Sequence, residues 1–258
     1  MLAVENISLW LIALCICAAF LAGFVDAVAG GGGLIQLPTL LVVFPNTALA
    51  TIVGTNKSVS IFGTTAAANT YRKKLPTDRR VLVPMIIFAF LGSMAGSALV
   101  TYVEREWFEP IILVILIVVA LFTIFRPTFG QHEKNIKNAA TFKSVLLGGV
   151  IGFYDGIIGP GTGMFLLFGL VSVLGSTFLQ ASATAKFVNV ATNFASLVIF
   201  IPGGHIIWLL TLVMAPANLL GGVVGARTAL DKGSKFVRAI FIIMIAVLII
   251  RFISTVLN

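Results

Sequence analysis

The chain has 258 residues, of which 59% are hydrophobic and only 10% are charged, and its mean hydropathy is +1.10. Soluble domains carry about 25% charged residues, so this chain cannot cover an aqueous surface and is expected to be an integral membrane protein. The formal net charge of +8 does not indicate nucleic-acid binding, because most Lys and Arg residues fall in three segments, 72–80, 126–143 and 232–238, as expected for cytoplasmic loops.

Apolar stretches recur along the chain at the length of roughly 17–25 residues that a spanning helix needs. We predict spans at about 8–28, 47–70, 80–102, 109–125, 144–158, 177–200, 206–230 and 236–256. Two shorter apolar pieces, at 34–44 and 163–174, follow glycine clusters and are too short to cross a bilayer. Because alternating barrel segments are missing from the sequence, these stretches predict an all-α fold with 8–10 transmembrane segments.

The first helix is expected to be retained, because residues 1–8 lack the basic residues of a secretory signal. Cys15 and Cys17 lie two positions apart on that helix and point to different sides. We therefore expect both thiols to be free packing residues.

A Gly-Phe-x-Asp motif occurs twice, at 23–26 and 152–155, and each copy leads into a glycine cluster. The offset of 129 residues also aligns Thr55-x-Lys57 with Thr184-x-Lys186. It aligns Gly92 and Gly96 with Gly221 and Gly225 as well, and we expect these small residues to serve helix packing. The chain is therefore predicted to contain two membrane repeats, 1–125 and 144–258, joined by a cytoplasmic linker, 126–143.

Charges in equivalent loops predict that the two repeats have opposite orientations in the membrane. The basic loop 72–80 corresponds to about 201–209, which has no Lys or Arg, whereas the acidic loop 104–109 corresponds to a basic segment. By the positive-inside rule we expect Lys73 and the linker in the cytoplasm, and Glu106, His205 and both termini outside. This orientation predicts inverted repeats, each with a broken or re-entrant first helix followed by three spanning helices.

The glycine clusters are candidates for a binding site, because irregular backbone at membrane depth is tolerated where it lines a cavity or is buried in protein. Each cluster precedes a short helix whose N-terminus offers free N–H groups and a partial positive charge. Two such ends would suit an anion, although tight helix crossing is the alternative explanation. The predicted anion-binding residues of the clusters are Gly30, Gly31, Gly32, Gly33, Gly159, Gly161, Thr162 and Gly163.

Four interior charges occupy equivalent positions in the two repeats. Lys57 and Lys186 fall in the middle of predicted spans, where a charge is costly, and would either attract an anion or pair with Asp26 and Asp155. The two aspartates would either carry a coupling proton or hold the glycine loops. Neutral polar residues on the same or neighbouring helices complete the predicted binding site: Gln36, Asn56, Asn189 and Asn193.

Signatures of enzymes are missing from the sequence, which has no phosphate loop, no HExxH motif and no cysteine–histidine cluster. We therefore expect no catalytic residues, no metal site and no cofactor, and we expect a gradient rather than ATP to drive any transport.

The doubled motif, together with Gly54-Thr55-Asn56-Lys57 and Thr184-Ala185-Lys186, resembles the TauE/SafE family of sulfite exporters and related anion transporters. The second repeat departs from the first by having Ala183 and Ala185 in place of Gly54 and Asn56. The resemblance implies a multi-pass transporter in a bacterial-type inner membrane for a small sulfur-containing anion, such as sulfite, thiosulfate, sulfoacetate or another sulfonate.

The function that we predict from the sequence is secondary transport of such an anion across the cytoplasmic membrane. The alternatives are an anion channel and a membrane subunit that delivers sulfur compounds to an enzyme. The expected partners are the anion and the lipid bilayer, with no nucleic acid.

Overall fold

The structure is a computed structural model that describes residues 9–100, 140–157 and 159–256. These residues are almost entirely helical, and no strand is found among them. The helices are α1 (Leu9–Ala29), α2 (Gly33–Val43), α3 (Leu49–Arg72), α4 (Arg79–Leu99), α6 (Ala140–Ile157), α7 (Thr162–Leu174), α8 (Phe178–Phe200) and α9 (Trp208–Val256). The prediction of an all-α membrane protein is confirmed.

The predicted segments correspond closely to these helices, and the two short apolar pieces are α2 and α7. The helix α6 begins at Ala140, so the end of the predicted linker is helical. The two predicted helices after residue 206 form one element, α9, which is broken at Gly233 (φ 74°, ψ −172°). The predicted span 109–125, the acidic loop 104–109 and most of the linker lie outside the described residues.

Local sequence explains where the longer helices begin. Asp78 precedes α4 and accepts a hydrogen bond from the backbone N–H of Arg80 at 2.9 Å. Thr177 precedes α8 and forms a capping box with Gln180, in which each side chain accepts from the other residue's backbone N–H. These caps satisfy N–H groups that a helix cannot satisfy internally.

Four elements in the described part of the chain are long and apolar enough to cross a membrane: α1, α4, α8 and the segment Trp208–Met244 of α9. The helix α3 is 24 residues long, but its many buried polar side chains make it less apolar. The helices α2 and α7 have only 11 and 13 residues and cannot span the bilayer alone.

The first helix of each predicted repeat packs along a helix of the other repeat. The helix α4 lies along α6, and α9 lies along α1. A Cβ atom added at Gly92 would lie 2.5 Å from the carbonyl oxygen of Gly149, and one at Gly221 would lie 2.1 Å from that of Phe20. These glycines permit close helix crossing, so the packing role predicted for them is confirmed.

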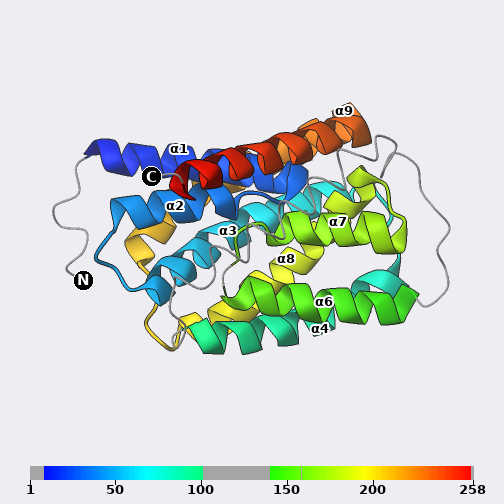
Figure 1. Ribbon diagram of the computed structural model, residues 1–258, viewed down its shortest axis with the longest axis horizontal. Coiled ribbons are helices and arrows are strands. Elements are labelled where there is room, and N and C mark those ends of the chain that lie inside the picture. Colours follow the sequence, from blue (N-terminus) through cyan, green and yellow to red (C-terminus); the bar gives the residue numbers. More distant parts are fainter. Residues whose placement is uncertain (1–8, 101–139, 158, 257–258) are drawn as a thin grey trace.

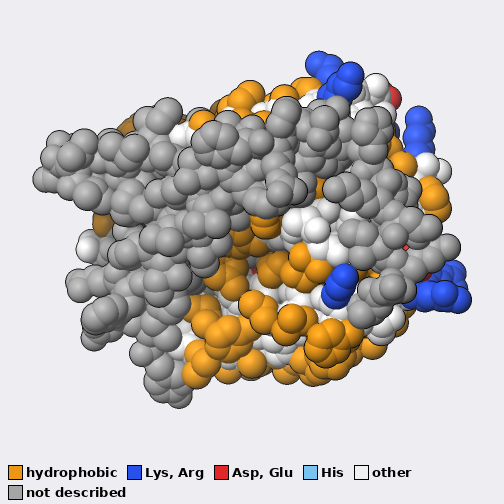
Figure 2. Space-filling view, turned by 45° about the vertical axis from the view of Figure 1, so that its right-hand side comes forward, with side chains coloured by type: hydrophobic (Ala, Val, Ile, Leu, Met, Phe, Trp, Pro, Cys, Tyr) orange, Lys and Arg blue, Asp and Glu red, His pale blue; other side chains and the backbone are white. Residues whose placement is uncertain are grey.

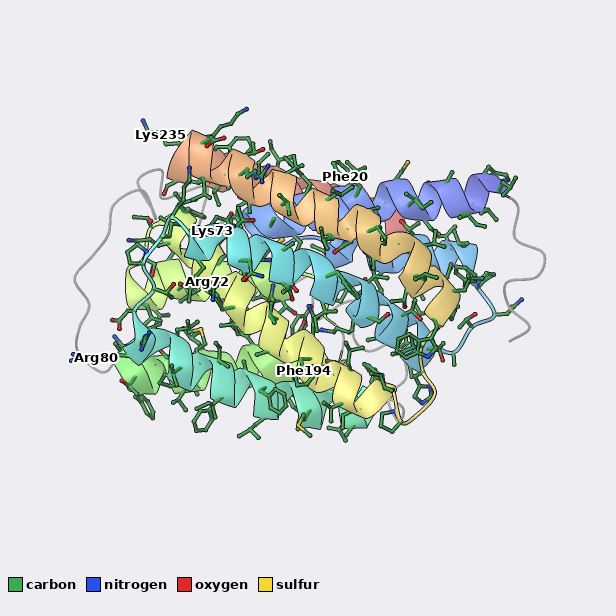
Figure 3. The ribbon with its side chains drawn as sticks, turned by 180° about the vertical axis from the view of Figure 1, so that it is seen from behind. Phe20, Arg72, Lys73, Arg80, Phe194 and Lys235 are labelled. Carbon is green, nitrogen blue, oxygen red and sulfur yellow. The ribbon has the colours of Figure 1, made fainter. Side chains whose placement is uncertain are left out.

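The loop 73–78 and its sequence equivalent, 201–207, lie at opposite ends of the helical bundle (Figure 1). Arg80 of α4 and Lys235 of α9 lie at the same end as Lys73 (Figure 3). Figure 2 shows Lys and Arg side chains gathered toward this end and hydrophobic side chains along the flank below. That distribution agrees with the positive-inside rule, and the inverted orientation of the repeats in a membrane stays a prediction.

Candidate functional site

The first glycine cluster separates α1 from α2. The helix α1 ends at Ala29, Gly30 adopts a positive φ of 81°, and α2 begins at Gly33. The last carbonyl groups of α1 would lack intrahelical partners. Side chains from α3 and α8 satisfy them: Lys186 donates to the carbonyl of Asp26 at 2.7 Å, Tyr71 to that of Ala27 at 2.9 Å, and Ser182 to that of Val28 at 2.7 Å.

The second glycine cluster separates α6 from α7 and is stabilised by its own set of hydrogen bonds. Gly159 and Gly161 have positive φ values of 85° and 82°, which a residue with a side chain rarely adopts. Tyr154 donates to the carbonyl of Pro160 at 2.6 Å, and Thr162 donates to that of Gly159 at 2.7 Å. The predicted loop residues Thr162 and Gly163 already belong to α7.

The two breaks touch each other inside the protein. A Cβ atom added to Gly30 would lie 2.1 Å from the carbonyl carbon of Gly163, and one added to Gly33 would lie 3.1 Å from the Cα atom of Pro160. Both contacts are between backbones, so these positions need glycine for space. The two breaks therefore approach one another, and the cluster residues are largely buried.

The first turns of α2 and α7 meet at this contact without side-chain caps. Their N-cap residues are Gly32 and Gly161, and neither supplies a capping hydrogen bond. From the contact, α2 and α7 extend toward opposite ends of the molecule (Figure 1). Two helix N-termini therefore direct their partial positive charges into one buried region.

The four interior charges form two ion pairs, and each pair joins the two halves of the chain. Lys57 Nζ of α3 lies 2.6 Å from Asp155 Oδ2 of α6, although outside the angles of a well-aligned hydrogen bond. Lys186 Nζ of α8 lies 2.7 Å from Asp26 Oδ2 of α1 and donates a hydrogen bond to it. Of the two explanations for the lysines, the contacts show pairing with the aspartates for both Lys57 and Lys186.

Both lysine heads lie at the glycine breaks. Lys57 Nζ would be 3.1 Å from a Cβ atom added to Gly159. Lys186 Nζ donates to the backbone carbonyl of Asp26, which also accepts a hydrogen bond from the backbone N–H of Gly30. The two lysine side chains are at most 2% exposed. Each cation therefore lies beside the backbone of the break formed by the other half.

Two buried asparagines each have a side-chain oxygen that receives no hydrogen bond from the described residues, Oδ1 of Asn56 and Oδ1 of Asn189. Both residues are at least nine-tenths buried, at 3% and 6% exposure. The Asn189 amide is directed at the contact between the breaks, since its Nδ2 would be 3.0 Å from a Cβ atom on Gly163. A buried acceptor without a partner is costly, and a ligand that carries an N–H or O–H group can supply the missing bond.

The remaining predicted residues lie around this centre in different ways. Asn193 Nδ2 contacts its repeat equivalent, Thr64 Oγ1, at 3.4 Å across 129 positions in sequence. A Cβ atom on Gly31 would point at the methionines of α7 and α9, and one on Gly32 would meet the carbonyl oxygen of Ala22. The geometry brings Gly30, Gly33, Gly159, Gly163 and the lysines together, while Gly31 and Gly32 pack against helices.

Asn218 was not anticipated from the sequence, yet it connects three other helices to α9. Its Nδ2 donates to the carbonyl of Ala19 at 3.0 Å and to Oε1 of Gln36 at 3.1 Å, and Gln36 donates to the carbonyl of Asn56 at 3.3 Å. At the equivalent positions of the other half the chain has Ala89 for Asn218 and Phe165 for Gln36. The signal that the sequence offered for Asn218 was an amide side chain in the middle of the apolar stretch 206–230.

Gly54 has a packing role that its motif did not reveal. A Cβ atom there would lie 2.0 Å from the carbonyl oxygen of His205, and Thr55 Oγ1 accepts from the backbone N–H of Ile207 at 2.9 Å. His205 is partly exposed, and its ring Nδ1 lies 3.4 Å from Thr51 Oγ1. The loop at 201–207 docks onto α3 at this point.

Comparison with known proteins agrees with this architecture. The family model described as "Sulfite exporter TauE/SafE" matches residues 15–252. The chain belongs to the TauE/SafE family. No solved structure matches the chain significantly.

Named relatives of this TauE/SafE protein are all described as membrane transporters. It is 33% identical to the "Probable membrane transporter protein" of Haemophilus influenzae over 239 residues, 93% of each chain. It is 33% identical to "Probable membrane transporter protein ORF9" of Sinorhizobium sp, over 97% of this chain and 95% of the relative. It is 34% identical to "Probable membrane transporter protein YfcA" of Escherichia coli K12, over 89% and 85%. The protein is thus a membrane transporter of this family, and the names indicate transport rather than catalysis.

Proposed function

We propose that this transporter carries small sulfur-containing anions, such as sulfite, thiosulfate, sulfoacetate or another sulfonate, across the cytoplasmic membrane by secondary transport. The observation that carries the proposal is the buried contact of two uncapped half-helix N-termini, with Lys57 and Lys186 beside it. Helix N-termini at broken helices bind anionic groups of substrates in transporters built this way. The family description, which names a sulfite exporter, supports sulfur as the central atom.

The lysines alone do not create an anion site, because each is already paired with an aspartate. The positive potential at the contact comes first from the N–H groups and dipoles of α2 and α7, which no acidic side chain caps. A bound anion would add hydrogen bonds from the lysines, each of which has three N–H donors. The Nδ2 group of Asn189, which is directed at Gly163, would add a further N–H donor.

The contact between the two breaks also indicates a small substrate. Gly30 and Gly163 touch through their backbones, so no side chain separates them. A compact oxyanion can accept several short N–H bonds at such a place, as at other helix N-termini. We propose that residues 1–125 and 144–258 act as the two repeats of one transport domain, with both termini outside.

Binding measurements on the purified protein test this proposal, using a panel of sulfite, thiosulfate, sulfoacetate and methanesulfonate with chloride and acetate for comparison. We expect saturable binding of sulfur oxyanions and saturable flux in proteoliposomes. Flux that rises linearly with concentration and needs no gradient coupling would indicate a channel. Binding without any flux would favour a subunit that delivers sulfur compounds to an enzyme.

Single lysine variants locate the site within the protein. We expect Lys57→Ala and Lys186→Ala to abolish or sharply weaken anion binding, and Lys57→Gln to be intermediate if hydrogen bonding contributes beside charge. Lys73→Ala is the matched control, because Lys73 is exposed in the loop after α3. If both buried variants stay monodisperse and bind sulfur oxyanions as the parent does, the lysines only hold the fold and the proposed site is wrong.

A further inference from the structure

The charges of the candidate site sum to zero before any substrate binds. Lys57 and Lys186 carry two positive charges, and their partners Asp155 and Asp26 carry two negative charges. All four side chains are at least four-fifths buried, and both pairs lie at the contact of the two breaks. A substrate anion therefore enters a region that has no excess positive side chain.

Binding a monoanion there would leave the side chains and the anion with one net negative charge in a region of low dielectric constant, which is unfavourable. The dipoles of α2 and α7 supply about half a unit at each terminus and offset much of this charge, but they are fixed partial charges and bring no counter-ion across the membrane with the anion. A proton is the smallest ion that restores neutrality, and the two carboxylates are the groups beside the lysines that can take it. Protonation of one carboxylate would also free its lysine to donate to the anion.

We propose that Asp26 takes up a proton when the anion binds, so that this protein moves anion and proton together; the inference rests on the proposed function. The Asp26 side chain is 17% exposed, against 5% for Asp155, so it has the better access to a proton source. A carboxylate exposed to lipid would be very costly, so that surface is best explained by a path that water can reach.

The contacts of Lys186 also favour Asp26 as the proton site. Lys186 Nζ holds both the carboxylate and the backbone carbonyl of Asp26, each at 2.7 Å. When the carboxylate is protonated, the carbonyl still anchors the lysine at the first break. One N–H donor is then released toward the anion without losing the position of the cation.

The groups that surround Asp26 come from several helices. Lys186 approaches from α8, and the pair formed by Lys57 of α3 and Asp155 of α6 lies at the other break. Tyr71 of α3 donates to the next carbonyl of α1. The helix α9 packs against this part of α1 through glycine, and Gly32 of α2 lies against the Asp26 Cβ atom. The negative charge of Asp26 is therefore balanced by a lysine in the protein before an anion binds.

Linkage gives the sign and the size of the effect. If the anion binds with one proton, a higher pH weakens binding by about tenfold per pH unit wherever Asp26 is ionised in the free protein. The same coupling predicts that a pH gradient drives anion accumulation in proteoliposomes. Thiosulfate and methanesulfonate are suitable probes, because their own charge stays constant around neutral pH, unlike that of sulfite.

The experiment measures the affinity of the purified full chain for methanesulfonate and thiosulfate across neutral pH, with proton uptake followed by calorimetry in buffers of different ionisation enthalpy. We expect about one proton per methanesulfonate, and affinity that falls by about tenfold per pH unit. In Asp26→Asn, a neutral side chain of the same shape, we expect binding that persists at high pH, no longer depends on pH and takes up no proton.

Two further variants make the assignment specific. Asp78→Asn is the matched control, because Asp78 is an exposed N-cap for which asparagine is an equally good substitute, and it should keep the parent's pH dependence. If Asp155→Asn removes the pH dependence and Asp26→Asn does not, the assignment to Asp26 is overturned. Binding by the parent that is independent of pH would overturn proton coupling altogether. Failure of every anion in the panel to bind would instead overturn the proposed function.

Discussion

The ion pair between Lys57 and Asp155 offers the sharpest test of how the two halves are held together. Replacing Lys57 by methionine keeps most of the side-chain volume but leaves Asp155 buried without its cation, at 5% exposure. At the observed separation of 2.6 Å, the Coulomb attraction is about 6 kcal/mol at an effective dielectric constant of 20. Breaking a buried pair from one side costs roughly 3–5 kcal/mol, and we expect Lys57→Met to lie in that range.

Double variants distinguish the pairing of Lys57 with Asp155 from a pairing of Lys57 with Asp26, which the sequence also permits. The double variant Lys57→Met/Asp155→Asn removes both charges of the pair, and it should recover most of the lost stability because no charge is stranded. The double variant Lys57→Met/Asp26→Asn is the matched control. It should not be rescued, since Asp26 pairs with Lys186 and Asp155 would remain without a cation.

The apparent melting temperature of the detergent-purified protein, followed at one fixed scan rate, measures these differences. A change of 1 kcal/mol corresponds to about 2–4 °C in a protein of this size, so Lys57→Met should lower the midpoint by on the order of 10 °C. The pairing would be refuted if Asp26→Asn rescued Lys57→Met as well as Asp155→Asn does. It would also be refuted if Lys57→Met melted like the parent.

Three other outcomes are expected. Gly30→Ala should prevent stable folding, because the added Cβ would lie 2.1 Å from Gly163 and the φ of residue 30 is positive. Gly149→Ala is the control, because a Cβ atom there has open space, and it should melt no lower than the parent. If the two variants behaved alike in thermal unfolding, that would contradict the contact of the breaks. Asn218→Ala should cost about 1–3 kcal/mol by stranding buried polar groups, and an unchanged midpoint would argue against the amide network. Single cysteines at 73 and 205, in a chain without its native cysteines, should react with impermeant reagents from opposite sides; labelling from one side would exclude inverted repeats.

Much of the fold could be predicted from the sequence because the bilayer constrains local composition. Apolar length indicated α1, α4 and α8 within a few residues, since a spanning helix must satisfy its own backbone. The glycine clusters indicated the breaks before α2 and α7, because runs of glycine disfavour continuous helix. The repeat offset also indicated which charges are equivalent, as a property of the chain alone.

Only the tertiary structure decided which of these residues meet. Lys57 was equally compatible with Asp26 and Asp155, and the tertiary arrangement brought its side chain to Asp155 of α6. The tertiary structure also gave adjacent glycines different roles: Gly30 touches the other break, while Gly31 faces methionines. Spacing and composition act along the chain, whereas ion pairs, backbone contacts and bridging amides depend on how distant helices cross, and that crossing is set by close packing of the whole bundle.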